Sequence, residues 1–522
     1  MAKSFLETIT AGYGFSDPAI VLGAALEGGA AHPEPKIRIP LATVNRHGLI
    51  AGATGTGKTK TLQLLTEQLS AAGVPVFVAD VKGDLSGLAA PGLPGDKISS
   101  RAGDVGWSWT PTAYPVEFVS LTGALGIQLR ATMSSFGPLL LGKVLSLNDT
   151  QTSVLTMVFK YADDQQLPLL DLSDLRAVLQ WLVSDEGKPA LAGYGGMSSA
   201  TVGVLLRKLI ELESQGAEQF FGEPEFDVRD MLRTTSDGRG VVTCLELADV
   251  QDKPMLWSTF MMWLLAELYQ HLPEAGDLPK PKLVFFFDEA HLLFDEAPKA
   301  FRDQIEQVIR LIRSKGIGVY MVTQTPKDVP PDVLAQLGNR VQHALRAHTP
   351  DDDKAIKATV RTFPKTPFYD LEETLTSLGI GEAVVTVLDP RGTPTPVAAT
   401  RLIPPASRMA PLTPEELQAD IAQSDLLDDY ATAVDRESAR EMLASRMARS
   451  EAPAAAERDA VPAPARPKKS AAGTIAKAAG ATMIGALTGT IGRTIGREVV
   501  RGLFGLLGAK PPRSTSRRTS RW

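Results

Sequence analysis

A glycine-rich segment in the first quarter of the chain has the residue types and spacing of a phosphate-binding loop. Residues 52–59 read GATGTGKT, which fits the pattern G-x-x-x-x-G-K-[ST]. Glycines let backbone N–H groups surround phosphate oxygens, because no Cβ atom blocks their approach. We expect Lys58 to reach the β- and γ-phosphates of ATP and the Thr59 hydroxyl to hold Mg²⁺. The residues expected to contact the nucleotide are Gly52, Thr54, Gly55, Thr56, Gly57, Lys58, Thr59 and Lys60.

Two carboxylates follow a short apolar segment much later in the chain. Leu283–Phe287 is a run of five apolar residues, and Asp288 and Glu289 come directly after it. Ligands of open α/β sheets bind at the carboxyl ends of the strands, so both side chains are expected near the phosphate loop. We expect Asp288 to coordinate Mg²⁺ and Glu289 to be the general base that activates water. The alternative is a capped strand–helix junction without chemistry.

Other polar residues are candidates for contacts with the γ-phosphate. Gln324 follows the apolar run 319–323 and is expected to sense the γ-phosphate or to orient the water, although it could also cap a turn. Arg313 and Arg340 are candidates for an arginine that a neighbouring subunit supplies to neutralise transition-state charge. Arg346 is a third candidate for the same role.

Three charged residues follow another predicted strand, residues 74–80. Asp80, Lys82 and Asp84 would lie at the same sheet edge as the phosphate loop. They could position Mg²⁺ or the attacking water. A turn formed around Gly83 explains the same residues equally well.

Alternating strands and helices must position these residues. The predicted strands cover residues 74–80, 240–245, 283–287, 317–323, 341–347 and 383–388. Helices are predicted between most of them, notably over Pro254–His271 and Ala300–Ser314. This alternation indicates an α/β fold with a mainly parallel sheet. Residues 288–291 spell DEAH, the name of a helicase box, but too little α/β pattern follows to build the second domain that those helicases need.

Composition and charge exclude several classes of protein. The chain has 522 residues, of which 44% are apolar and 22% charged, so it is neither wholly disordered nor fibrous. A net charge of −6 excludes a uniformly basic nucleic-acid coat. The single cysteine, Cys244, excludes an internal disulfide and fits a reducing compartment. Because the first residues lack the apolar core of a signal peptide, a cytoplasmic location is expected.

Composition shifts divide the chain into a core and C-terminal extensions. We expect a lead-in over residues 1–44 and a core over residues 45–408, with a mostly helical insertion at 115–236. Thr413, Pro414 and Glu416 are typical of a helix start, and one long polar helix is predicted over 413–449. An Ala/Pro/Lys linker is expected at 450–470, followed by a Gly/Arg-rich tail at 471–522 that is helical and partly disordered.

The charge of the chain is concentrated at its C-terminal end. Residues 466–522 contain twelve basic residues and one acidic residue, which leaves −17 on the rest of the chain. The uncharged stretch 478–492 is shorter than the roughly twenty residues that cross a bilayer. Self-association, contact with a membrane surface and contact with DNA are all compatible with this tail, as is a basic tail that packs weakly.

Several long segments together resemble the HerA/FtsK superfamily of P-loop motor ATPases. They are NRHGLIAGATGTGKTKTLQ at 45–63, ADVKGDLSGLA at 79–89, KPKLVFFFDEAHLLF at 280–294 and RLIRSKGIGVYMVTQTP at 310–326. Within that superfamily they are most similar to a bacterial HerA-like branch of uncharacterised function. The resemblance covers about residues 10–408.

The resemblance implies a RecA-like ATPase core that uses ATP and Mg²⁺. It implies a homo-oligomer, with a hexameric ring among the options, in which the nucleotide lies between subunits. In the family, Lys58 and Thr59 match the P-loop pair, Asp288 and Glu289 the Walker B pair, and Gln324 the sensor. Arg313 and Arg340 fall in the stretches that supply arginines in trans.

The function implied by the resemblance is that of a DNA translocase or helicase. The N-terminal β-barrel through which such enzymes dock onto a nuclease has no room in residues 1–44, so a nuclease partner is not expected. Two alternatives remain open at this stage. One is a secretion or transfer ATPase that contacts a membrane surface through the tail, and the other is a slow nucleotide-dependent switch or scaffold.

Overall fold

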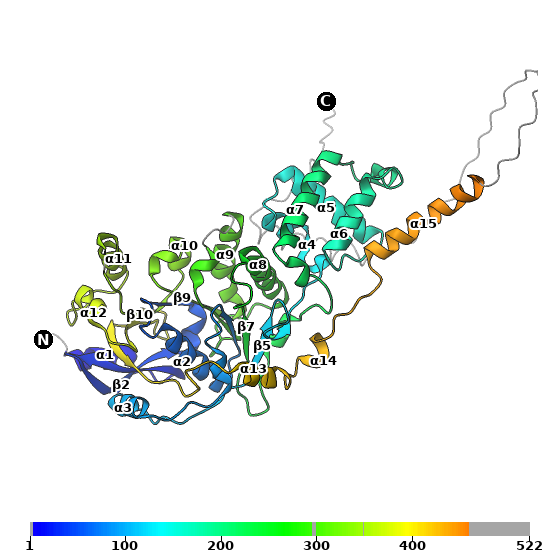
Figure 1. Ribbon diagram of the computed structural model, residues 1–522. Helices are drawn as coiled ribbons and strands as arrows, with labels where there is room; N and C mark the ends of the chain where they lie inside the picture. Colours follow the sequence, from blue (N-terminus) through cyan, green and yellow to red (C-terminus); the bar gives the residue numbers. More distant parts are fainter. Residues whose placement is uncertain (1–3, 295–298, 348, 459–522) are drawn as a thin grey trace, which may run out of the picture.

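The computed structural model describes residues 4–294, 299–347 and 349–458, and its centre is one large mixed β-sheet (Figure 1). Within these residues the sheet has twelve strands in the order β2-β1-β12-β11-β10-β3-β9-β8-β4-β7-β5-β6. The pairs between β10 and β6 are all parallel, whereas the pairs between β2 and β10 are antiparallel. This arrangement confirms the expected α/β fold with a mainly parallel sheet.

The strands and α-helices of the described residues have the following bounds. The strands are β1 (Ala19–Glu27), β2 (Ala30–Pro40), β3 (Gly48–Ala51), β4 (Val76–Asp80), β5 (Val116–Ser120), β6 (Ile127–Gln128), β7 (Val242–Glu246), β8 (Leu283–Phe287), β9 (Ile317–Thr323), β10 (Asn339–His343), β11 (Glu382–Thr386) and β12 (Ala398–Leu402). The α-helices are α1 (Phe5–Tyr13), α2 (Lys58–Ala71), α3 (Asp96–Asp104), α4 (Met133–Val144), α5 (Asp149–Asp164), α6 (Leu172–Val183), α7 (Ser199–Ser214), α8 (Pro254–His271), α9 (Lys299–Ile312), α10 (Pro331–Leu334), α11 (Pro350–Val360), α12 (Leu371–Ser377), α13 (Pro414–Ile421), α14 (Leu427–Tyr430) and α15 (Ala439–Arg458).

Apolar side chains cover both faces of the central strands, which explains their continuous apolar sequence. Side chains alternate between the faces of a strand, so Phe77 and Phe285 pack together on one face while Val78 and Phe286 lie on the other. The first face is covered by α8 and α9, and the second by α1 and α2. The parallel strands are therefore buried from both sides, and their ends are left for polar residues.

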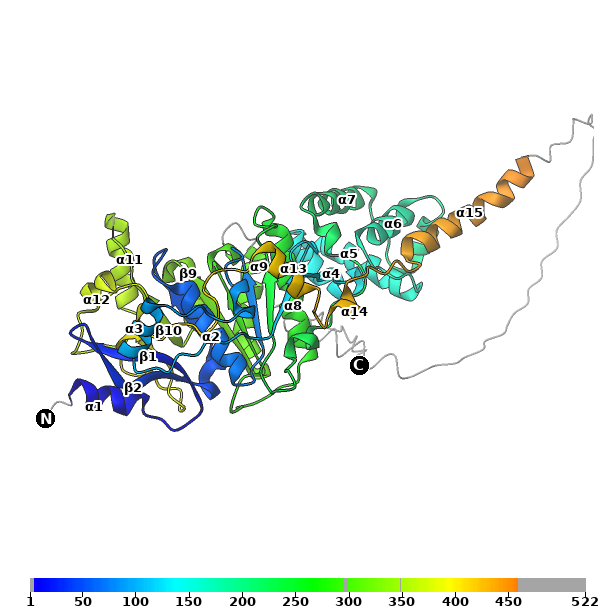
Figure 2. The ribbon, with the colours of Figure 1, turned by 60° about the horizontal axis from the view of Figure 1, so that its bottom comes forward.

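The helical insertion begins later than the sequence predicts. Residues 116–120 and 127–128 form β5 and β6, which extend the parallel sheet beyond β7 instead of belonging to the insertion. The sequence pattern around residue 115 does not show this, because β5 joins the sheet by pairing with β7, which lies more than 120 residues away. The helices α4–α7 follow and lie at the end of the molecule opposite to α1 and β2 (Figure 2).

The first strands of the chain belong to the same sheet as the core. Strand β1 pairs with β12, and β2 pairs with β1, so residues 19–40 add two antiparallel strands to one edge. Ser4 caps α1, and a capping box with Glu7 fixes its start. The segment expected as a separate lead-in over residues 1–44 is therefore continuous with the core sheet in the structure.

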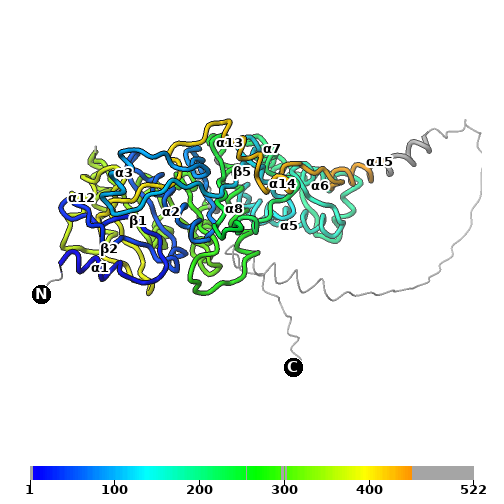
Figure 3. The backbone as a smooth tube through the Cα atoms, turned by 90° about the horizontal axis from the view of Figure 1, so that it is seen from below, coloured from blue at the N-terminus to red at the C-terminus, as the bar shows by residue number. Residues whose placement is uncertain are grey.

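The single helix predicted over residues 413–449 was wrong, because the structure has three helices there. Thr413 caps α13 with a capping box to Glu416, as the sequence indicates, but α13 ends at Ile421. The chain then bends so that Leu426 and Tyr430 enter the large hydrophobic core. Helix α13 contacts β5, and α14 contacts β6. The chain then reaches α6, against which α15 packs (Figure 3).

The C-terminal extension is described only as far as residue 458. Helix α15 runs to Arg458, so the first residues of the linker expected at 450–470 are helical. The rest of that linker and the predicted tail over 471–522 lie outside the described residues. Along the part of the chain that the structure describes, no helix has both the length and the apolarity needed to span a bilayer.

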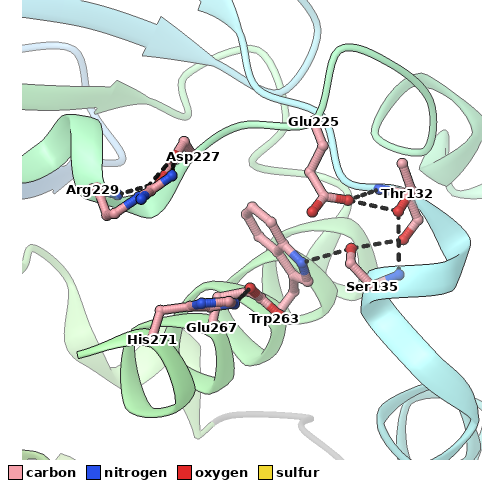
Figure 4. Close-up of polar contacts among 8 residues, drawn as sticks. All are labelled: Thr132, Ser135, Glu225, Asp227, Arg229, Trp263, Glu267 and His271. Atoms are coloured by element: carbon pink, nitrogen blue, oxygen red, sulfur yellow. Dashed lines mark hydrogen bonds and ion pairs between the residues drawn. The ribbon is translucent and has the colours of Figure 1, made fainter. Parts of the chain in front are cut away.

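A partly buried polar junction joins the helical insertion to the sheet domain (Figure 4). Glu225, on the connection that leaves the insertion, accepts hydrogen bonds from the backbone N–H and the hydroxyl of Thr132, at 2.7 and 2.6 Å. Thr132 is the N-cap of α4, and its hydroxyl accepts the N–H of Ser135. The indole N–H of Trp263, on α8, donates to the Ser135 hydroxyl at 3.3 Å. The two connections and α8 are thus fixed to one another.

We expect Glu225→Ala to loosen the insertion, because it removes two hydrogen bonds to a charged acceptor. Such bonds contribute about 1.5–3 kcal/mol each, so the expected destabilisation from losing both is about 3–6 kcal/mol. Glu225→Gln keeps one acceptor oxygen and should therefore lose less stability than Glu225→Ala. The measurement is denaturant unfolding together with hydrogen exchange in α4. Glu218→Ala, at an exposed glutamate of the same segment, is the matched control. Equal stability of the Glu225→Ala and Glu218→Ala variants would contradict the role given to Glu225.

Candidate functional site

The phosphate loop lies between β3 and α2 and needs glycine at three positions. Gly55 has φ +76° and Gly57 has φ +110°, a left-handed region that other residues rarely adopt. Gly52 is constrained by space instead, since a Cβ atom there would lie 2.4 Å from the Cβ atom of His343. The loop leads directly into α2, which begins at Lys58. Backbone N–H groups at such a helix start bind anions.

Lys58 is folded into the loop, whereas Lys60 points away from it. The Lys58 ammonium donates to the Gly52 carbonyl at 2.8 Å and to the Ala53 carbonyl at 3.3 Å. Burial lowers the pKa of Lys58, although the nearby Glu289 opposes this shift. Lys60 instead contacts Gln63 and the carbonyl of Met409. Of the two lysines, Lys58 is therefore placed for phosphate contact.

The hydroxyl residues of the loop differ in exposure. Thr56 is buried, and its hydroxyl donates to the Ala53 carbonyl at 2.7 Å, which closes the loop. Thr54 and Gly55 are exposed at the tip of the loop, and Thr59 is half-buried in the first turn of α2. Thr59 is therefore the hydroxyl residue of the motif that lies within α2 and is still partly accessible.

Gln324 and the phosphate loop are joined through the backbone. Strand β9 lies beside β3, and the Gly52 N–H donates to the carbonyls of Thr323 and Gln324 at 3.3 and 3.2 Å. The Gln324 side chain is exposed at this edge of the sheet. The structure therefore brings the end of β9 to the start of the loop, as the motif order predicts.

Asp288 is brought to the same edge by the pairing of β8 with its neighbours. Phe287 is paired with Ala79 of β4 and with Met321 of β9, so Asp288 emerges beside Asp80. Carboxylate oxygens of Asp80, Asp84 and Asp288 lie within 4.8 Å of one another. Burial raises the pKa of Asp288 to about 7, and the neighbouring carboxylates of Asp80 and Glu289 add to the shift.

This acidic cluster fits a divalent cation. Asp288 is 3% exposed, and its Oδ2 atom has no hydrogen-bond partner among the described residues; the same holds for Asp84 Oδ1. Buried carboxylate oxygens without partners are costly, and hard cations such as Mg²⁺ prefer oxygen ligands. The sequence alone left Asp84 open between a turn and an ion site, and its unpaired oxygen favours the ion.

Glu289 is buried and held in an uncommon backbone conformation. Its φ of +45° lies in the left-handed region, and its side chain is 7% exposed. The Glu289 Oε1 atom is ion-paired with the ammonium of Lys82, and Oε2 lies 3.3 Å from Nδ1 of His291. Burial lowers the pKa of Lys82, but its contact with Glu289 and the charges of Asp288 and Asp84 together raise it more, so the net shift is upward.

The structure does not bring Arg313 or Arg340 to the phosphate loop of the same chain. Arg313 lies between α9 and β9, at the amino end of a strand whose carboxyl end meets the loop, and it is exposed. Arg340 is the second residue of β10, and its guanidinium donates to the carbonyls of Leu334, Leu337 and Thr362. Both arginines therefore lie at the edge formed by the amino ends of the strands, whereas their own phosphate loop lies at the edge formed by the carboxyl ends.

A cavity of about 260 Å³ adjoins the first turn of α2; of the residues predicted to contact the nucleotide, Gly57 and Lys60 line it, and the rest of its lining was not predicted from the sequence. Its walls combine Thr61 and Leu64 of α2, Ile98 and Arg101 of α3, and loop residues around Ile380 and Pro404. The Arg101 guanidinium donates to the carbonyls of Ile380 and Gly381. Because these residues come from three distant segments, no local sequence pattern marks the cavity.

The sequence profile of the family described as "Helicase HerA-like C-terminal" matches residues 26–512. The chain belongs to this family. HerA, named as the DNA double-strand break repair helicase of Saccharolobus solfataricus, is 21% identical over 351 residues, which are 67% of this chain and 63% of that protein. The chain thus spans less than two thirds of the length of that relative. The assignment to the HerA/FtsK superfamily is confirmed.

Solved structures of the plasmid coupling protein TrwB share the fold. The complex of TrwB with the ATP analogue ADPNP superposes with a TM-score of 0.51, covering 77% of this chain and 98% of TrwB at 15% identity. The complex of TrwB with ADP and Mg²⁺ gives a TM-score of 0.50 with the same coverage and identity. This likeness supports the RecA-like P-loop fold of the family.

A buried glutamate near the acidic cluster predicts a pH-dependent stability. Glu246 ends β7 and is 2% exposed, and burial together with the charge of Asp80 raises its pKa from 4.5 to about 8. Between these values the folded protein holds a proton that the unfolded chain releases, so stability falls as the pH rises through this range. Each pKa unit corresponds to about 1.4 kcal/mol.

We expect Glu246→Gln to reduce the loss of folding stability at rising pH, because the amide cannot ionise. The measurement is the melting temperature between about pH 5 and about pH 8, the range in which the linkage acts. The wild-type melting temperature should fall across this range more steeply than that of the variant. Glu218→Gln serves as the control at an exposed position. Identical slopes for wild type and Glu246→Gln would contradict the burial of an ionisable proton at this site.

Proposed function

We propose that this chain is a Mg²⁺-dependent ATP hydrolase that assembles into a ring and acts as a DNA translocase or helicase. One observation carries the ATPase proposal: the Lys58 loop and the Asp288–Glu289 pair, which are 230 residues apart, converge at one edge of the sheet. Charges of Glu289 and Asp288 act on the Lys58 ammonium, which supports their proximity. Membership of the HerA-like family favours a DNA-handling motor over other ATPases.

Each residue of the site has a distinct role in this proposal. Lys58 and the N–H groups of the loop bind the β- and γ-phosphates. Thr59 and Asp288 hold Mg²⁺, which polarises the phosphate oxygens when it is bound, and Asp84 supports the same cation. Glu289 accepts the proton of the attacking water, and Gln324 orients that water at the end of β9.

The cavity beside α2 is proposed to hold the nucleobase. It is lined by Gly57, at the end of the phosphate loop, and by Thr61 of α2. Its walls are largely apolar, as expected for a pocket that packs against a flat ring. Arg101 keeps two loop carbonyls engaged, which leaves few acceptors to read the edge of the base. We therefore expect weak discrimination between ATP and GTP.

The placement of the arginines supports assembly into a ring. An arginine on the far side of the sheet can reach a phosphate only in a neighbouring subunit, where it would neutralise transition-state charge. Arg313 is exposed, whereas Arg340 would first have to release three carbonyls. Arg313 is thus the better candidate in this arrangement, with Arg340 as the second.

We expect Lys58→Ala to lose nucleotide binding and Glu289→Gln to keep it while losing hydrolysis. A general base contributes about 10²–10⁴-fold to the rate, so turnover of Glu289→Gln should fall at least about 100-fold. The measurements are fluorescent-nucleotide titration and phosphate release. Glu415→Gln, at an exposed position of α13, is the matched control. Normal turnover of Lys58→Ala would remove the phosphate-loop assignment, and normal turnover of Glu289→Gln would require another base.

The DNA proposal predicts that DNA stimulates ATP hydrolysis by the full chain. The phosphate release rate is compared with and without single- and double-stranded DNA, alongside the oligomer mass. Stimulation should decline steeply as salt rises, because DNA contacts of a motor are mainly to phosphates. Hydrolysis that no DNA stimulates at any salt concentration would contradict a DNA translocase. In that case vesicle co-sedimentation lost on deletion of residues 471–522 would indicate the membrane-associated alternative, and binding without turnover would indicate the switch.

A further inference from the structure

Lys82 and Glu289 form an ion pair inside the site that the proposed mechanism does not explain. Lys82 lies two residues beyond β4, and Glu289 two residues beyond β8, on neighbouring parallel strands. The Lys82 ammonium contacts the Glu289 Oε1 atom. That oxygen is one of only two with which Glu289 could accept a proton from water. As long as the ion pair persists, the general base is partly occupied.

The backbone of Lys82 is fixed by hydrogen bonds, whereas its side chain is half-exposed and is held only by the ion pair that the described residues show with Glu289. Asp80 is fully buried, and its carboxylate accepts the N–H groups of Lys82, Gly83 and Leu85 at 3.1, 2.8 and 2.8 Å. Gly83 has φ +72°, which completes the tight turn. The side chain of Lys82 is nevertheless 49% exposed. A long cationic side chain on a rigid turn can exchange one anionic partner for another without moving the sheet.

Among the described residues, no second lysine or arginine forms an ion pair with Glu289. Its side chain is 7% exposed, and Oε2 makes no hydrogen bond among the described residues, although His291 Nδ1 lies 3.3 Å away. Its left-handed backbone, with φ +45° and ψ +50°, is the kind of strain that concentrates at functional positions. Lys82 is thus the cation that determines how Glu289 is paired.

Lys82 also belongs to the electrostatic environment of the phosphate loop. The positive charge of Lys82 lowers the pKa of Lys58, whereas the negative charge of Glu289 raises it. Two ammonium groups therefore face the same region, and Lys58 is held by the carbonyls of the loop. A γ-phosphate, which lies furthest from the base, would bring a further negative charge to the Lys82 ammonium.

We propose that Lys82 is a positioning residue that responds to the γ-phosphate: a nucleoside triphosphate draws the Lys82 ammonium away from Glu289, and this exchange releases Glu289 to accept the proton of the attacking water. A diphosphate leaves the ion pair intact. The inference rests on the proposed function, because it assigns the γ-phosphate to the same site. It makes Lys82 a residue that distinguishes ATP from ADP, rather than a residue that only stabilises the turn.

The test measures the affinities for a non-hydrolysable triphosphate and for a diphosphate, so it does not depend on hydrolysis. Lys82→Met should weaken triphosphate binding by at least about tenfold, the factor equivalent to about 1.4 kcal/mol, and leave diphosphate binding nearly unchanged. Lys82→Arg should retain most of the discrimination. Lys354→Met, at an exposed lysine of α11, is the matched control. A purely structural role would lower both affinities together.

A double-mutant cycle with Glu289→Gln tests the exchange itself. If the triphosphate must break the Lys82–Glu289 ion pair, Glu289→Gln should tighten triphosphate binding several-fold in the presence of Lys82 and have no effect in the Lys82→Met background. The same effect of Glu289→Gln in both backgrounds overturns the inference, as does an unchanged ratio of the two affinities in Lys82→Met. Nucleotide binding that survives Lys58→Ala overturns the proposed function instead, so the two failures are distinguishable.

Discussion

The parallel alignment of β3, β9, β8 and β4 is the constraint on which the site depends. Because these four neighbouring strands run in the same direction, their carboxyl ends form one edge, and the residues that follow them meet there. The phosphate loop follows β3, Gln324 follows β9, the carboxylates follow β8 and the Asp80 turn follows β4. A change in the order or direction of any one strand would separate these groups.

The same alignment concentrates buried charge, which is costly unless it is compensated. Asp80 is stabilised by three backbone N–H groups, and Glu289 is paired with Lys82 through one oxygen. Among the described residues, Asp84, Asp288 and Glu289 each keep one carboxylate oxygen without a hydrogen-bond partner. Burial raises the pKa of Asp288, and the neighbouring charges of Asp80 and Glu289 add to this shift. A site with unsatisfied carboxylates beside an anion-binding loop is suited to a cation and a phosphate that arrive together.

The C-terminal segment connects the ends of the molecule. After the last strand, residues 414–430 run past β5 and β6, and α15 packs against α6 of the insertion. Buried anchors hold this path: Tyr430 lies in the core and donates to Asp230, and the Ser438 hydroxyl donates to Asp174. Helix α15 therefore starts beside the helical insertion, and its far end extends away from the insertion (Figure 1).

Local patterns in the sequence determined the strands, the phosphate loop and the Walker B carboxylates. The predictions for 283–287, 317–323 and 254–271 match the observed elements because an apolar run or a helical period is a property of consecutive residues. The boundary of the insertion at β5, the bends after Ile421, the cavity beside α2 and the Lys82–Glu289 ion pair were decided by the tertiary structure alone. Each of them depends on which distant segments become neighbours, and that choice follows from the pairing and burial of the whole sheet.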